Sequence, residues 1–307
     1  MDEKFIFKLP DKFKQNILGL HAKNGEQWLN NLPNLIAEIS NDWLITVEKP
    51  FPNLSYNFVA PCVRADGTEA VLKIGFNEEN SIIFSEAKFL KLLGGKGAVK
   101  LLQFDENFCA LLLERLLPGE NLKRICQTND EQATGIAIEV MRRLRCKPPE
   151  MVEFPMLENW MSGLQTAAKV NFAPRMVAKA RNYFEELSNN SEQNLLLHGD
   201  LHHENILSAG REPFLAIDPK GVIGNIGYEI SVFLNNQRRL IQTRQNLSQI
   251  LAQRVEQFAK SFEIEPLKLR RWAFAQAVLS AWWVFEDTGT SGEKWTTYAD
   301  IWEEIGV

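Results

Sequence analysis

The feature that most constrains this chain is a run of polar residues set between short apolar segments. The run, called here the polar loop, reads His198-Gly199-Asp200-Leu201-His202-His203-Glu204-Asn205. Asp218 follows thirteen residues after Asn205, at the end of a further apolar segment. A polar turn between strands is often only a connection, in which Asp and Asn side chains bond to their own backbone. A second carboxylate at this offset favours a functional site instead.

Asp200, Asn205 and Asp218 carry the predicted chemistry. They place two carboxylates and an amide at the ends of short, strand-like segments. Mg²⁺ takes few hard oxygen ligands from a protein, because phosphate groups and water complete its coordination shell. Asn205 and Asp218 can supply those ligands, which leaves Asp200 to accept the proton of an attacking hydroxyl. The pattern therefore predicts magnesium-dependent phosphoryl transfer.

The histidines of the polar loop allow two other interpretations. His198, His202 and His203 could hold a transition metal together with Glu204 or Asp200. Their spacing matches neither HExxH nor another zinc-ligand pattern, which weighs against this alternative. His198 could also act as a base, since the ordinary pKa of imidazole is about 6.5. We favour Asp200 as the base and a structural role for His198.

The rest of the chain divides into a mixed first part and a mainly helical second part. Its 307 residues correspond to about two domains at roughly 150 residues each. In the first part, spacing and turn residues predict helices at 12–48, with Pro33 starting a second helix, and at 81–93, and strands at 56–59, 70–74, 99–104 and 109–115. The second part is predicted to be helical at 120–193 and after 228, with strands at 195–197, 206–207 and 214–217.

Composition and charge exclude several classes of protein. The net charge of −5 and the pI of about 5.6 argue against a general nucleic-acid binder, which needs a basic surface. The four cysteines form no CxxC pair, as is typical of a reducing compartment. No signal peptide is evident, and the apolar stretch 273–285 is too short for a bilayer and predicts a buried helix. We expect a cytoplasmic protein without membrane or nucleic-acid partners, and the sequence leaves its oligomeric state open.

Several motifs together resemble one family of enzymes. His198-Gly199-Asp200, Asn205 and Ile217-Asp218-Pro219 look like the catalytic and metal-binding loops of protein-kinase-like phosphotransferases, in the form that antibiotic kinases have. Further stretches that match are 28–33, 66–73, 112–119, 218–221 and 227–229. The combination resembles the aminoglycoside/hydroxyurea antibiotic-resistance kinase family, which includes streptomycin 6-kinases.

The resemblance implies an α+β fold of the protein-kinase type with two lobes. Residues 1–116 would form a small, β-rich N-lobe with an N-terminal helical extension, which covers the nucleotide. Residues 117–307 would form a larger, mainly helical C-lobe with the catalytic loop and the acceptor site. Pro219 stands where protein kinases have Phe, and no APE-like segment follows, which argues against a protein substrate.

The resemblance also implies ATP and Mg²⁺ as cofactors and assigns residues to the nucleotide. Lys73 would bind the α- and β-phosphates, and Glu86 would hold Lys73 in an ion pair from a position off the apolar face of its helix. The backbone of Glu114 to Leu116 would meet adenine.

A loop at 50–57 would cover the phosphates, with Ser55 as a contact. It contains no glycine, and a glycine-free loop approaches a ligand less closely. This departure keeps open the alternative of a catalytically weak nucleotide-binding module.

The expected acceptor is a hydroxyl of a small, cationic molecule, an aminoglycoside such as streptomycin. A polycation needs carboxylates, and residues 284–307 carry six acidic residues against Lys294 alone. Glu286 and Asp287, at the end of the expected helix, are the candidate ligands, although a solvated acidic tail explains the same charges equally well. A kinase of an ordinary metabolite, such as a sugar or an amino alcohol, is the alternative among enzymes.

Overall fold

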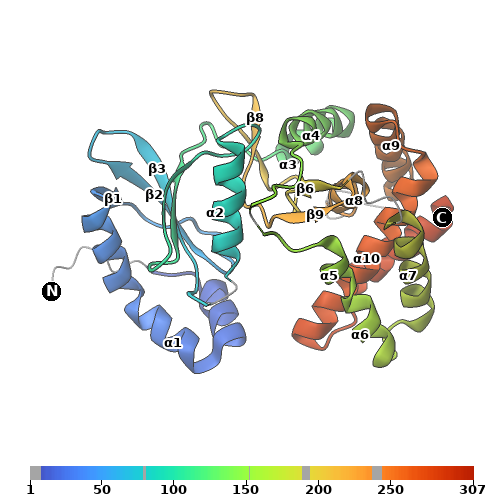
Figure 1. Cartoon of the computed structure of the whole chain (residues 1–307), viewed down its shortest axis with the longest axis horizontal. Coiled ribbons are helices and arrows are strands. Elements are labelled where there is room, and N and C mark those ends of the chain that lie inside the picture. The colour runs from blue at the N-terminus through green and yellow to red at the C-terminus, as the bar shows by residue number, and fades with distance from the viewer. Residues whose placement is uncertain (1–7, 79–80, 152, 189–193, 237–243) are drawn as a thin grey trace. The chain divides into compact units, whose positions relative to one another are not determined.

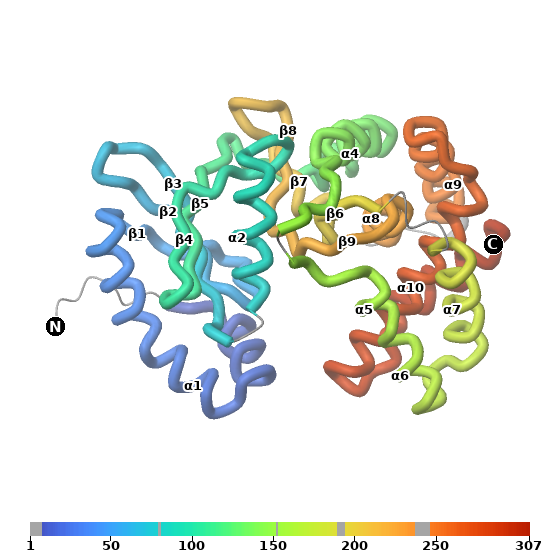
Figure 2. Tube along the Cα trace, viewed as in Figure 1, coloured from blue at the N-terminus to red at the C-terminus, as the bar shows by residue number. Residues whose placement is uncertain are grey.

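The computed structural model describes residues 8–78, 81–151, 153–188, 194–236 and 244–307. The chain divides into two compact units, Met1–Leu117 and Pro118–Val307. Figures 1 and 2 show a twisted sheet with helices in the first unit and a helix-rich second unit. This segregated mixture of helices and antiparallel strands confirms the predicted α+β class.

A five-stranded antiparallel sheet is the centre of the first unit. Its spatial order is β1-β2-β3-β5-β4. The strands are β1 (Ile45–Val47), β2 (Phe58–Arg64), β3 (Glu69–Ile74), β4 (Leu101–Asp105) and β5 (Ala110–Glu114). The helices are α1 (Asp11–Asp42) and α2 (Ile82–Leu93). The turn at Asp66-Gly67, with Gly67 at φ +80°, joins β2 to β3 as the sequence predicts.

The two helices lie on opposite faces of this sheet. Alternate residues of a strand point to opposite faces, and Leu72 and Ile74 of β3 belong to the apolar core that α1 completes with Phe13 and Ile17. Lys73, between them, points to the other face, which α2 covers (Figure 1). The single charged residue of this strand interior is thereby directed at α2.

Two details of the first unit differ from the sequence prediction. The long helix is not restarted at Pro33, which lies inside α1; its break is at Ala22, at φ 45° and ψ −122°. The two halves of α1 approach closely there, because a Cβ on Gly25 would lie 2.7 Å from the Ile17 carbonyl oxygen. The predicted helix also extended to residue 48, whereas α1 ends at Asp42 and residues 45–47 form the edge strand β1.

The second unit is built from helices around two short strand pairs. β6 (Leu195–Leu197) pairs with β9 (Val222–Gly224), and β7 (Ile206–Ser208) pairs with β8 (Phe214–Ala216), both antiparallel. The polar loop connects β6 to β7, and Asp218 lies in the connection from β8 to β9. The predicted strands are present, and β9 is an additional one.

A central helix, α10 (Pro266–Thr288), organises the other helices of this unit. It is buried over most of its length from Leu269 to Trp282, as its apolar sequence predicts. It packs against α6 to α9 and α11. The helices are α3 (Lys123–Cys126), α4 (Asp130–Leu144), α5 (Leu157–Met161), α6 (Gly163–Lys169), α7 (Pro174–Ser188), α8 (Ile226–Leu234), α9 (Arg244–Phe262) and α11 (Glu293–Ile305). In the described part of the chain, no helix has both the length and the apolar character that a membrane span requires.

Candidate active site

Lys73 and Glu86 form a buried ion pair in the first unit. Lys73 Nζ donates to Glu86 Oε2 at 2.5 Å, and the two side chains are 6% and 0% exposed. The prediction that Glu86 lies off the buried face of its helix is therefore wrong, although the structure brings the two residues together. Glu86 can enter the interior because the lysine neutralises it, since an unpaired buried charge is costly.

The glycine-free loop at 50–57 is fixed to the rest of the first unit. Leu54 is buried in the core, and the Phe51 N–H donates to the Val59 carbonyl at 3.0 Å. Ser55 is exposed, and its carbonyl accepts a hydrogen bond from Asn16 Nδ2 of α1 at 3.0 Å. The loop is thus held by the N-terminal helix as well as by the sheet.

The predicted adenine contacts lie at the end of β5. The Glu114 carboxylate accepts from the Lys100 N–H at 2.8 Å, and the Glu114 N–H donates to the Lys100 carbonyl at 3.0 Å. The Glu114 side chain therefore ties β5 to the segment before β4. Leu116 is buried.

His198 holds the polar loop to the segment that carries Asp218. Its Nε2 lies 2.8 Å from the Ile217 carbonyl oxygen, and its own carbonyl accepts from the Lys220 N–H at 2.8 Å. Burial lowers the pKa of His198 to about 3. The ring is therefore neutral at physiological pH, and its hydrogen bond holds the polar loop to the segment of Ile217.

The predicted metal ligands, Asn205 and Asp218, flank the β7–β8 hairpin. The Ile217 N–H donates to the Asn205 carbonyl at 2.9 Å, which joins the two ends of the hairpin. Asn205 Nδ2 donates to the Asp200 carbonyl at 2.9 Å. That bond fixes the amide so that its acceptor atom, Oδ1, is the one left to meet a cation. Asp218 has φ +62°, an unusual value for a residue other than glycine.

Asp200 is partly exposed and lies near two basic side chains. His202 Nε2 lies 3.7 Å from its Oδ1, and Lys220 Nζ lies 4.0 Å from its Oδ2. Desolvation in the loop raises the pKa of Asp200, and the neighbouring Lys220 ammonium opposes that rise. A carboxylate with a raised pKa is a better proton acceptor than an ordinary one.

Glu229, from α8, is hydrogen-bonded to the polar loop. The sequence motifs gave this residue no role. Its Oε2 accepts from the Gly199 N–H at 2.8 Å, and the side chain is buried. Burial raises the pKa of Glu229 to about 8. Gly199 itself has φ +84°, and a Cβ there would lie 2.9 Å from the Trp160 ring. The loop therefore requires glycine at this position.

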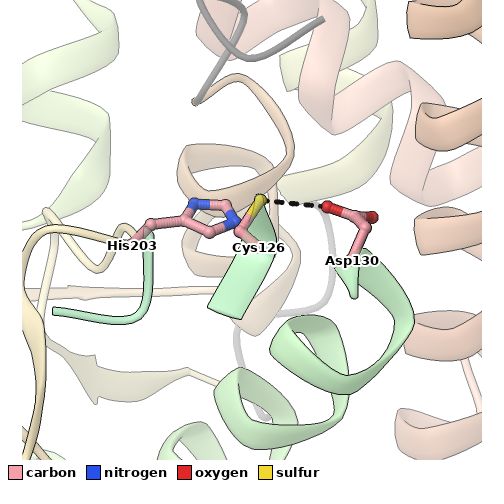
Figure 3. A group of neighbouring side chains, drawn as sticks. All are labelled: Cys126, Asp130 and His203. Atoms are coloured by element: carbon pink, nitrogen blue, oxygen red, sulfur yellow. Dashed lines mark hydrogen bonds between the residues drawn. The ribbon is translucent and has the colours of Figure 1, made fainter. Parts of the chain in front are cut away.

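His203 of the polar loop lies close to Cys126 and Asp130 (Figure 3). In the described ranges they are the group of three whose ligand atoms lie within 4.8 Å of one another, as a metal would require. Arg254, which is 0% exposed, already puts a cation there: it forms a fork with Asp130, at 3.0 Å and 2.5 Å, and its Nη2 lies 3.4 Å from His203 Nε2. Burial also raises the pKa of the Cys126 thiol to about 12, so the sulfur stays protonated. These residues therefore suit an arginine and not a transition metal.

The predicted acceptor ligands, Glu286 and Asp287, are exposed in the last turn of α10. Within the acidic segment 284–307, Glu303 is already paired, with Arg175 at 2.6 Å and with Lys179 at 3.0 Å. A path of aromatic rings leads from this end of α10 to the polar loop. Trp283 packs edge-on against Trp160, with ring centroids 6.0 Å apart, and Trp160 abuts Gly199.

The strand-borne lysine paired with a glutamate of the next helix, together with a loop that carries Asp200 and Asn205, defines a protein-kinase-like phosphotransferase. Solved structures share this fold. An amicoumacin kinase has a TM-score of 0.59 at 15% identity over 92% of this chain and 95% of its own. A choline kinase from Cryptosporidium parvum has a TM-score of 0.53 at 14% identity over 88% and 92%.

Sequence comparison identifies the family within this class. The model of the aminoglycoside/hydroxyurea antibiotic resistance kinase family matches residues 43–288, and the chain belongs to that family. The streptomycin 6-kinase of Streptomyces griseus is 27% identical over 91% of both chains. The hydroxyurea phosphotransferase of Kitasatospora aureofaciens is 28% identical over 92% of this chain and 82% of its own. The predicted family and the predicted enzyme class, a kinase of small molecules, are confirmed.

Proposed function

We propose that this protein transfers the γ-phosphoryl group of ATP to a hydroxyl of an aminoglycoside such as streptomycin, with Mg²⁺ as the metal. The match to the resistance-kinase family over residues 43–288 is the observation that carries the proposal. Two curated relatives are named streptomycin 6-kinase, and both are matched over more than nine-tenths of their length. The modified drug would be inactive, and the reaction would take place in the cytoplasm, where ATP is available and the four free cysteines stay reduced.

In the first unit, Lys73 would neutralise the α- and β-phosphates of ATP. Its pairing with Glu86 fixes the ammonium in one rotamer, so little side-chain freedom is lost on binding. The backbone of Glu114 to Leu116 would meet adenine, and Ser55 would contact phosphate. The fixed loop at 50–57 makes this part of the protein stiffer than a glycine-rich loop would.

In the second unit, Asn205 and Asp218 would hold Mg²⁺. The donor set fits this ion, because a carboxylate and an amide oxygen are hard ligands and two protein ligands leave room for phosphate and water. When bound, the ion offsets the negative charge of the phosphates during transfer.

Asp200 would orient the acceptor hydroxyl and accept its proton. Its partial exposure gives a substrate access, and its raised pKa suits it to the task. Because phosphoryl transfer depends mainly on positioning and charge, the rigid hold of His198 and Glu229 on the loop serves Asp200 directly.

The acceptor would bind as a cation. Glu286 and Asp287 offer exposed carboxylates at the end of α10, and the Trp160–Trp283 pair connects that end to Gly199. Aromatic faces attract guanidinium and ammonium groups. An ordinary metabolite such as choline or a sugar would use the same hydroxyl chemistry with fewer positive charges.

The test is ATP-dependent phosphorylation of a panel that contains streptomycin, hydroxyurea, choline and neutral sugars, followed by mass spectrometry. We expect streptomycin to gain one phosphoryl group, and Asp200→Asn to serve as the inactive control. Phosphorylation of choline or a sugar alone would establish the metabolite kinase instead. Nucleotide binding without transfer to any member would establish the catalytically weak module.

A further inference from the structure

Lys220 lies between the two carboxylates of the site. Its Nζ is 3.7 Å from Asp218 Oδ2 and 4.0 Å from Asp200 Oδ2. These distances are within ion-pair range of both, so the ammonium bridges the proposed base and the proposed metal ligand. The side chain is 26% exposed, which leaves it accessible to a ligand.

The backbone around Lys220 is fixed more firmly than a surface turn would be. The N–H groups of Lys220 and Gly221 both donate to the His198 carbonyl, at 2.8 Å and 3.2 Å. Asp218 and Gly221 have φ values of +62° and +70°, which reverse the chain onto that carbonyl. A Cβ on Gly199 would lie 3.4 Å from the Cβ of Lys220, so the two chain segments run close together. The ammonium is therefore delivered to this place by the same contacts that build the polar loop.

Protein kinases commonly bind two Mg²⁺ ions through the aspartate and asparagine that correspond to Asp218 and Asn205. A second ion would have to share the Asp218 carboxylate with the first. In this protein the Lys220 ammonium already lies 3.7 Å from Asp218 Oδ2, and like charges at such short range repel each other. The lysine thus occupies the electrostatic role of a second cation.

We propose that Lys220 replaces the second divalent ion: the protein binds nucleotide with a single divalent cation, and the Lys220 ammonium contacts the transferring phosphoryl group. This inference rests on the proposed function. In the step, the bond from the γ-phosphorus to the bridging oxygen breaks and ADP leaves. A bond forms from the phosphorus to the acceptor oxygen, whose proton passes to Asp200. Lys220 donates hydrogen bonds to the phosphoryl oxygens and is not consumed.

Counting bound ions tests this directly. Mn²⁺ replaces Mg²⁺ in an electron paramagnetic resonance titration with the non-hydrolysable nucleotide AMP-PNP. We expect one Mn²⁺ per wild-type chain and two per Lys220→Met chain. Lys123→Met is the matched control, because Lys123 pairs with Glu204 of the same loop at 2.9 Å yet contacts neither carboxylate in the described contacts. It should bind one ion.

Kinetics supply the second readout. Lys220→Met should lower kcat by about 10²–10³-fold, the usual loss on removing one charge-stabilising donor. Raising the Mg²⁺ concentration should restore part of that loss, and Lys220→Arg should retain more activity than Lys220→Met. Two Mn²⁺ ions in the wild type, or wild-type kcat in Lys220→Met, would overturn the inference. The ion count needs no acceptor, so a failure of the proposed function to appear with any acceptor leaves this test decisive.

Discussion

The two units of the molecule differ in how their charged side chains are buried and paired. In the first unit, Lys73 and Glu86 are buried and paired at 2.5 Å, so neither charge can move or titrate without penalty. In the second unit, Asp200 and Asp218 are partly exposed, carry like charges and both lie near Lys220, at 4.0 Å and 3.7 Å. The loop that carries them is instead held by buried partners, His198 and Glu229. The pair that we propose to position the nucleotide is therefore buried and held side chain to side chain, whereas the proposed base and metal ligand stay accessible on a loop that is held by other residues.

The largest expected effect is the loss of phosphoryl transfer when Asp200 is replaced. Asp200→Asn keeps the shape of the side chain and removes the proton acceptor, so phosphoryl transfer should fall by about 10²–10⁴-fold. Nucleotide affinity should stay at the wild-type value, because Asp200 contributes no predicted nucleotide contact. Steady-state kinetics and calorimetry on the same preparation measure both. A variant that transfers phosphate at the wild-type rate would remove Asp200 from the mechanism.

The next effect concerns the metal. In Asp218→Ala, the dependence of nucleotide binding on Mg²⁺ should disappear, because the charged ligand is lost. Asn205→Ala should weaken that dependence less, since a neutral amide attracts the ion less strongly. Calorimetric titrations with ATP in Mg²⁺ and in EDTA report the difference. Equal Mg²⁺ dependence in wild type and Asp218→Ala would contradict the ligand assignment.

The locked pair should respond in stability as well as in activity. Glu86→Ala leaves the Lys73 charge buried without its partner, which should cost about 3–5 kcal/mol of unfolding free energy. The double variant Lys73→Met, Glu86→Leu should recover much of that stability without recovering activity, because apolar pairs often replace buried ion pairs well. Urea unfolding and nucleotide affinity separate the two effects. If Glu86→Ala unfolds at the wild-type urea concentration, the comparison between locked and open charges fails.

His198 and Glu229, the buried residues that hold the polar loop, predict that the unfolding free energy depends on pH between about 3 and 8. His198 has a folded pKa of about 3 against an ordinary 6.5, so its stabilisation is lost as the pH falls below 6.5. Glu229 has a folded pKa of about 8 against an ordinary 4.5, so its stabilisation is present at low pH and is lost as the pH rises from 4.5 through 8. Relative to Glu229→Gln, the wild type should therefore lose unfolding free energy as the pH rises from about 4.5 to about 8, with no further relative loss above pH 8. Parallel curves for the two proteins would show that Glu229 does not titrate in this range.

The smallest effect is expected at the exposed acids. Replacing Glu286 with Gln and Asp287 with Asn should raise the KM for a cationic acceptor by about 2- to 30-fold, from about 0.2–1 kcal/mol per exposed pair. The KM for ATP should not change. The acceptor KM should also depend less on salt, which screens surface charges over about 8–10 Å. A KM for the phosphorylated acceptor that is unchanged at low salt would assign these acids to a solvated tail.

Much of this arrangement could be predicted from the sequence, for a local reason. Asn205 and Asp218 flank a hairpin whose two strands are short apolar runs, so their proximity follows from the chain between them. The Lys73–Glu86 pair came from the family resemblance, whereas the depth at which Glu86 is buried depends on α2 packing on the sheet. The edge strand β1 has only three residues and leaves little periodic signal. The break at Ala22 has none, because alanine is a strong helix former.

Contacts distant in sequence were beyond prediction. Arg254 meets Asp130 across 124 residues and His203 across 51, and nothing in the local sequence marks that arginine. Glu229 stood in a recognised motif, but its hydrogen bond to Gly199 spans 30 residues. Such contacts follow from the packing of α4, α8 and α9 around the loop and become visible only in three dimensions.

The Arg254 contact has a consequence for which ions the protein can admit. A guanidinium stays protonated across the whole range of pH in which proteins fold. The His203 end of the polar loop therefore lies beside the charged Arg254 guanidinium. The Cys126 thiol and the His203 imidazole, which contact that guanidinium, are not available to copper or zinc. Asn205 and Asp218, the proposed ligands of an inorganic ion, would offer it oxygen donors. We therefore expect a soft metal to find no site at Cys126 and His203, although both residue types are ligands that such a metal prefers.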